Sequence, residues 1–77
     1  MIICINKERV DAQEANKMRV VLQADTTAEA ATEPKNGASV QDIEDGAIFY
    51  AGSLMVCLQD SKTYIMDSAG SWVEWTA

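Results

Sequence analysis

The C-terminal third of the chain, residues 54–76, constrains the fold most strongly. It contains three short apolar runs, separated by clusters of Asp, Ser, Lys, Ala and Gly at residues 60–62 and 67–70. Runs of this length that are rich in Val, Ile, Tyr and Trp and bounded by turn residues predict a three-stranded β-meander. The three expected strands are residues 54–58, 63–66 and 71–75.

Two more β-branched runs, residues 2–5 and 18–23, lie near the N-terminus and flank the polar loop 11–16. They predict an N-terminal β-hairpin over residues 1–24. A helix over residues 8–24 is the competing prediction, because its apolar residues have partial helical spacing. The apolar groups of Val20–Leu22 occupy both sides of the segment, which favours a strand.

Residues 25–36 are poor in large apolar side chains and contain the only proline, so they predict an extended connector. A short Thr-capped helix over residues 26–32 is the alternative. Ser39 followed by Asp42 predicts one short helical turn that directs Val40 and Ile43 into the core. Residues 37–77 then form one compact unit, and the fold class is mainly β, a small antiparallel sheet.

The strands of the meander carry apolar residues on both faces, whereas a half-buried sheet alternates apolar with polar residues. A chain of 77 residues has little material to cover both faces. We therefore expect the second face to meet a partner, most simply another copy of the chain. The candidate interface residues are the aromatic ones: Tyr64, Trp72, Trp75, Phe49 and Tyr50.

Charge and composition exclude several classes of function. The formal net charge is −6 and there is no histidine, so a nucleic-acid interface of clustered Lys and Arg is not expected. No catalytic motif stands out, and the two cysteines, Cys4 and Cys57, cannot complete a zinc site alone. We expect both to be reduced thiols, with a disulfide between them as the alternative. No cofactor, signal peptide or membrane segment is expected, and the chain is not expected to be an enzyme.

Residues 26–75 contain three segments with a common pattern: GASVQDIEDG at 37–46, IFYAGSLMVCL at 48–58 and DSKTYIMDSAGSWVEW at 60–75. Together with the N-terminal strand pair and the connector rich in Thr and Ala, this pattern resembles a group of small phage and prophage virion proteins. The resemblance implies a capsid accessory or head-fibre protein, made in the host cytoplasm and located in the virion. It implies binding to the major capsid or other virion proteins and to itself, a trimer being one form. A tail or baseplate component is the alternative.

Two further functions compete with this interpretation. Tyr64, Trp72 and Trp75 would suit a carbohydrate-binding module if they formed one stacking platform. The acidic surplus would suit a regulator of a basic host protein.

Overall fold

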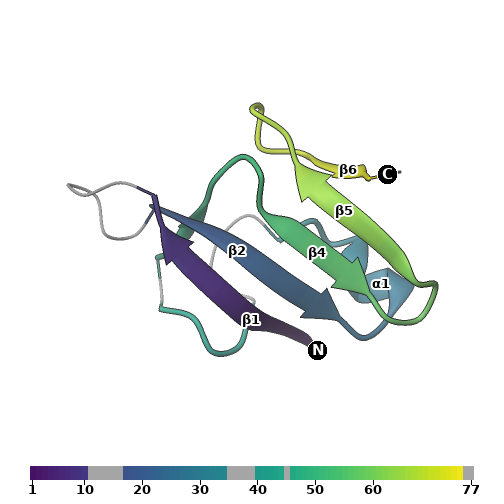
Figure 1. The fold of residues 1–77 in the computed structure, drawn as a ribbon. Helices are drawn as coiled ribbons and strands as arrows, with labels where there is room; N and C mark the ends of the chain where they lie inside the picture. The colour runs from purple at the N-terminus through teal and green to yellow at the C-terminus, as the bar shows by residue number, and fades with distance from the viewer. Residues whose placement is uncertain (11–16, 35–39, 45, 76–77) are drawn as a thin grey trace.

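A single mixed β-sheet organises the chain (Figure 1). The computed structural model describes residues 1–10, 17–34, 40–44 and 46–75. The spatial order of the strands is β1-β2-β4-β5-β6, and β3 pairs with β2. The mainly-β class predicted from the sequence is confirmed. The strands are β1 (Ile2–Arg9), β2 (Lys17–Ala24), β3 (Ile48–Phe49), β4 (Leu54–Cys57), β5 (Lys62–Met66) and β6 (Trp72–Glu74).

Strands β1 and β2 form the expected antiparallel pair, so the strand prediction for β2 is confirmed over the helix. A bulge between Cys4 and Asn6 shifts the register. Beyond it β1 continues to Arg9, further than its apolar run, because its charged residues gain cross-strand partners such as Glu8 with Arg19. The loop predicted at residues 11–16 lies outside the described residues.

The C-terminal meander is also confirmed, with β4, β5 and β6 antiparallel in sequence order. Its turns are held by aspartate side chains, as the sequence predicts. Asp67 Oδ1 accepts hydrogen bonds from the backbone N–H groups of Ala69 (3.0 Å) and Ser71 (2.9 Å). Asp60 Oδ1 accepts one from the Lys62 N–H group at 3.2 Å.

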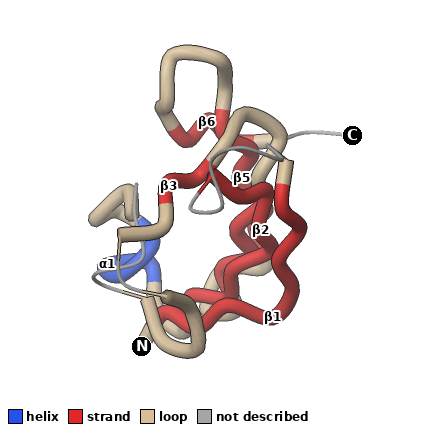
Figure 2. Tube along the Cα trace, turned by 90° about the vertical axis from the view of Figure 1, so that its left-hand side faces the viewer, coloured by secondary structure: helices blue, strands red, loops and turns tan. Residues whose placement is uncertain are grey.

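The two units join through parallel pairing of β2 with β4, so the sheet is mixed and the prediction of an antiparallel sheet is corrected. Val21 pairs with Leu54 and Ala24 with Cys57. Parallel neighbours need a crossover connection. Here the chain crosses over between Ala24 and Leu54. The crossover carries the helix to one side of the sheet (Figure 2) and then returns as β3, which pairs with the start of β2.

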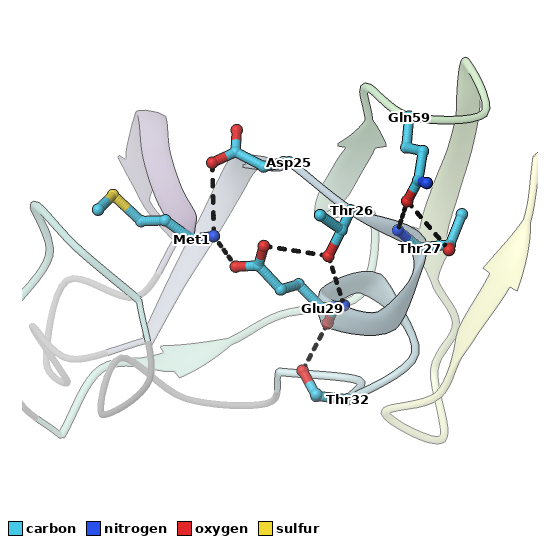
Figure 3. Close-up of polar contacts among 7 residues, drawn as sticks. All are labelled: Met1, Asp25, Thr26, Thr27, Glu29, Thr32 and Gln59. Atoms are coloured by element: carbon cyan, nitrogen blue, oxygen red, sulfur yellow. Dashed lines mark hydrogen bonds and ion pairs between the residues drawn. The ribbon is translucent and has the colours of Figure 1, made fainter.

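A short helix, α1 (Thr27–Ala30), lies in the segment predicted to be extended, so the Thr-capped alternative is correct. Figure 3 shows how its first turn is fixed. Thr26 Oγ1 accepts a hydrogen bond from the Glu29 N–H group, and Gln59 Oε1 accepts from the Thr27 N–H group at 2.8 Å. Glu29 also forms an ion pair with the amino group of Met1. Gln59, which is distant in sequence, thus supplies a hydrogen-bond acceptor for the first turn of the helix in addition to Thr26.

The helical turn predicted after Ser39 is not found in residues 40–44, because the backbone of Gln41 forms hydrogen bonds with β1 instead. Gln41 donates its backbone N–H to the Ile2 carbonyl and accepts from the Cys4 N–H, both at 2.9 Å. These bonds form a parallel bridge to β1 instead of a helical turn. Val40 is nevertheless buried and Ile43 packs against the core, as predicted.

The core lies on the side of the sheet that faces α1 and the loop before β3. Leu22, Met55 and Cys57 are completely buried at its centre. Alternate residues of β2 and β4 therefore point into this layer, and the residues between them point to the other side of the sheet.

The ladder along β2 is interrupted between β3 and β4, and the side chain of Ser53 fills the gap. Ser53 Oγ accepts a hydrogen bond from the Val20 N–H (3.1 Å) and donates one to the Tyr50 carbonyl (2.7 Å). Ser53 is completely buried and Val20 nearly so. The Ser53 hydroxyl thus accepts the hydrogen bond that a backbone carbonyl of a neighbouring strand would accept in an uninterrupted ladder.

Substituting Ser53→Ala should lower the free energy of unfolding by about 2 kcal/mol, because the Val20 N–H group loses its acceptor in the core. Urea denaturation followed by circular dichroism measures the loss. Ser71→Ala, at an exposed turn position, is the matched control and should change the midpoint little. Equal midpoints for the two variants would show that the Ser53 hydroxyl does not bridge the gap.

Candidate interaction surface

The side of the sheet away from α1 carries a row of apolar side chains that runs from β2 to β6. Directly paired residues of neighbouring strands point to the same side of a sheet. Val21 pairs with Leu54. Ile65 pairs with Leu54 on one flank and with Val73 on the other. The four side chains are therefore aligned across four strands.

A second row lies beside the first. Gln23 pairs with Val56, and Val56 pairs with Thr63. The Trp75 N–H group donates to the Thr63 carbonyl oxygen at 2.8 Å, which extends the ladder just beyond β6. We call the two rows the open face; its residues are Val21, Gln23, Leu54, Val56, Thr63, Ile65, Val73 and Trp75.

The open face is uncharged, although the chain carries a formal net charge of −6. Val73 and Trp75 are 44% and 48% exposed. The other members are half-buried by their neighbours in the sheet. The open face is thus uncharged and mainly apolar, with Gln23 and Thr63 as its polar members, and surfaces of this kind are used by soluble proteins to meet a partner.

The structure separates the five aromatic residues singled out from the sequence. Phe49 and Trp72 are buried in the core, and Tyr64 is half-buried against it. Tyr50 and Trp75 are exposed. Only Trp75 belongs to the open face.

Tyr64, Trp72 and Trp75 do not form one stacking platform. Tyr64 and Trp72 share the covered side of the sheet, and Trp75 lies on the opposite side by strand alternation. Trp72 is a core residue whose Nε1–H donates to the Pro34 carbonyl oxygen at 2.6 Å. Its position is explained by packing and by this hydrogen bond.

Tyr50 and Phe49 lie instead at a shallow pocket of ≈ 370 Å³. Phe49 and Met66 are buried residues that contribute apolar surface to it, whereas Tyr50 and Ile48 are exposed. The carboxylate of Asp67 also lies at this pocket, but its Oδ1 atom is already engaged in the turn. The pocket is therefore a small apolar recess beside that turn.

Two exposed ion pairs join neighbouring segments of the described residues. Lys7 Nζ donates to Glu44 Oε1 at 2.7 Å, which ties the Gln41 segment to β1. That hydrogen bond raises the pKa of Lys7 and lowers the pKa of Glu44. Similarly, Glu74 raises the pKa of Lys62 across a 3.2 Å ion pair. Both pairs connect segments that are distant in sequence or lie on neighbouring strands.

The cysteines are both free thiols. Cys57 is completely buried and Cys4 is half-buried. Burial raises the pKa of the Cys4 thiol, which favours its protonated form. Among the described residues, no group of three or more His, Cys, Asp or Glu side chains is placed to hold a metal ion.

Sequence reasoning pointed to the two-faced meander but did not name the aliphatic members of the open face. Alternation in 54–58 separates Leu54 and Val56 from Met55 and Cys57, and that signal was present. The contribution of Val21 depends on the parallel pairing of β2 with β4. No local pattern encodes that pairing.

Comparison with protein-family models, curated proteins and solved structures found no match to this chain. Within the described residues, no helix is long and apolar enough to cross a membrane.

Proposed function

We propose that this chain is a non-enzymatic structural protein that assembles through the open face of its sheet. The observation that carries the proposal is the uncharged apolar surface on an otherwise acidic chain. Exposure of such a surface to water is unfavourable, and contact with a partner removes the unfavourable contribution. The partners are other copies of the chain and a larger scaffold.

The setting that we propose is a phage virion, with the chain as a capsid accessory or head-fibre component made in the host cytoplasm. The support for it is the resemblance of residues 26–75 to small virion proteins. A tail or baseplate position uses the same surface and remains the alternative. A carbohydrate-binding function has less support, because its three aromatic residues lie on two sides of the sheet.

Particles purified from cells that carry the gene provide the test, with the chain quantified by mass spectrometry. We expect the unmodified chain in the particles. We expect Val73→Lys to reduce its incorporation at least about tenfold, since docking would bury an unpaired ammonium group. The matched control is Ala28→Lys, which adds the same charge at an exposed position of α1 on the other side of the sheet.

The outcomes separate the two parts of the proposal. If the unmodified chain is absent from particles, the virion setting is wrong. If Val73→Lys enters particles as well as Ala28→Lys does, the open face is not the docking surface.

A further inference from the structure

The outward side chains of β2 are uncharged at the centre of the strand, and charged residues lie towards its two ends. Arg19 lies near its start, Val21 and Gln23 at its centre, and Asp25 directly after its end. Both charged residues are exposed. Arg19 Nε donates to the Ala51 carbonyl at 3.4 Å, and Asp25 Oδ2 lies 3.4 Å from the amino group of Met1. Glu8 of β1 pairs with Arg19 and therefore lies on the same side of the sheet. Arg19 and Asp25 flank the open face at opposite ends of β2, each beside a group of opposite charge in its own chain.

The charge distribution specifies the partner. No charged side chain lies on the open face between Arg19 and Asp25, so a highly charged partner would find no pairing group there. Another uncharged apolar sheet face fits, and the chain itself supplies one. Interface centres are depleted of charge in general, and those between identical subunits are the more apolar.

The size of the surface corresponds to an interface smaller than the standard one. Each outward residue of a sheet occupies roughly 33 Å², from the strand spacing and the two-residue repeat along a strand. The eight residues of the open face then cover roughly 260 Å², and the outward half of the 28 residues in the five strands covers roughly 460 Å² in projection. Accessible surface exceeds flat projection, and a standard interface buries about 800 Å² on each partner. The open face thus has the proportions of an interface centre with a polar rim.

We propose that the open face is covered by the open face of a second copy, related by a two-fold axis in the plane of the interface and perpendicular to the strands. Under this symmetry β2 lies over the partner's β2 in the reverse direction. Arg19 then approaches the partner's Asp25, and the same contact recurs at the other end. Leu54 lies near the partner's Val56, and Val73 near the partner's Trp75. Because one patch serves both copies, the product is a closed dimer rather than a trimer.

This inference rests on the proposed use of the open face and specifies what occupies it. Sheets that pack face to face lie about 10 Å apart, with their strands rotated by about 30°. Arginine and aspartate side chains at the rim can span that separation. Contacts of this kind fix orientation more than they add affinity.

A charge exchange between two variants tests the geometry. In Arg19→Glu dimers, both rim contacts would place two carboxylates together, and in Asp25→Arg dimers two guanidinium groups. Each variant alone should dimerise roughly tenfold more weakly than the unmodified chain at low salt. In an equimolar mixture both contacts of the mixed dimer are complementary, so the mixture should regain the affinity of the unmodified chain.

Sedimentation velocity over a concentration series measures these affinities, and circular dichroism verifies that each variant is folded. A mixture that associates no better than its components overturns the proposed symmetry axis. An unmodified chain that sediments as a monomer or a trimer overturns the dimer. Neither result bears on incorporation into particles, which is measured separately.

A second measurement avoids charge reversal. Arg19→Lys retains the positive charge and supplies an amine to a zero-length carbodiimide cross-linker. We expect a link between position 19 and Asp25 that forms only between chains, detectable by mixing isotopically labelled and unlabelled protein. A dimer that gives no such intermolecular link contradicts the arrangement.

Discussion

Replacement of Trp72 by alanine is expected to lower the free energy of unfolding by about 3–5 kcal/mol. The indole is 7% exposed and lies in the core against the layer that covers the sheet. Its loss leaves a large cavity and removes the hydrogen bond that Trp72 donates to the buried Pro34 carbonyl. Domains of this size have a total stability of roughly 4–12 kcal/mol. The expected loss is therefore a large fraction of the total stability.

Trp75→Ala is the matched control, because the same side chain is removed from the opposite, exposed side of the sheet. At protein concentrations where the chain is monomeric, it should change the free energy of unfolding by less than about 1 kcal/mol. Urea denaturation of both variants gives the comparison. Trp72→Phe separates the two contributions, since it retains most of the ring and removes the N–H donor. A Trp72→Ala variant as stable as Trp75→Ala would contradict the assignment of Trp72 to the core.

Leu22→Ala is expected to lower the free energy of unfolding by about 2–5 kcal/mol. Leu22 is completely buried on β2, where it pairs with Cys4 on one flank and with Met55 on the other. A cavity at this position therefore weakens the packing of the N-terminal hairpin and the meander together. The surrounding backbone is fixed by ladders on both sides, so it can collapse only slightly into the space.

Leu58→Ala provides the same chemical change at a residue that is 51% exposed. Its effect on a dilute monomer should be below about 1 kcal/mol. Thermal unfolding followed by circular dichroism should show a midpoint for Leu22→Ala that lies well below that of Leu58→Ala. Coincident melting curves would mean that Leu22 is not in a tightly packed site.

The sequence predicted the parts of this fold that depend on neighbouring residues. Apolar runs bounded by Asp, Ser and Gly located the meander, and the aspartate turns formed as expected. These features are local because a strand's face and a turn's geometry are determined within a few residues.

The parts that the sequence did not predict depend on contacts between distant residues. The antiparallel prediction failed at the junction of β2 with β4, which joins residues on either side of a long crossover. Helix α1 was only an alternative, because its capping depends on Gln59 as well as on Thr26. The predicted turn near Asp42 was replaced by a bridge from Gln41 to β1. In each of these three segments, a strand pairing or hydrogen bond with residues distant in sequence determined the structure.

Of the candidate site, the sequence indicated a second apolar face but located it by its aromatic residues. Most of those residues fill the core or line a recess near β3. The open face is mainly aliphatic, because Val, Leu and Ile fit the flat pleated surface where strands lie side by side. The alternation of side chains along β4 already separated Leu54 and Val56 from the core residues. The alignment of Val21 with them depends on the pairing of β2 with β4, which the sequence did not predict.

The two edges of the sheet differ in a way that limits growth. On β1, the outward N–H of Cys4 is bonded to Gln41 and that of Lys7 to the Asn6 side chain, and a bulge separates them. On β6, the described residues pair only with β5. A fibre lengthens strand by strand only when every subunit offers two receptive edges. Because the β1 edge is blocked, edge-to-edge strand pairing can join no more than two copies. We therefore expect copies that are crowded on one scaffold not to polymerise into fibres.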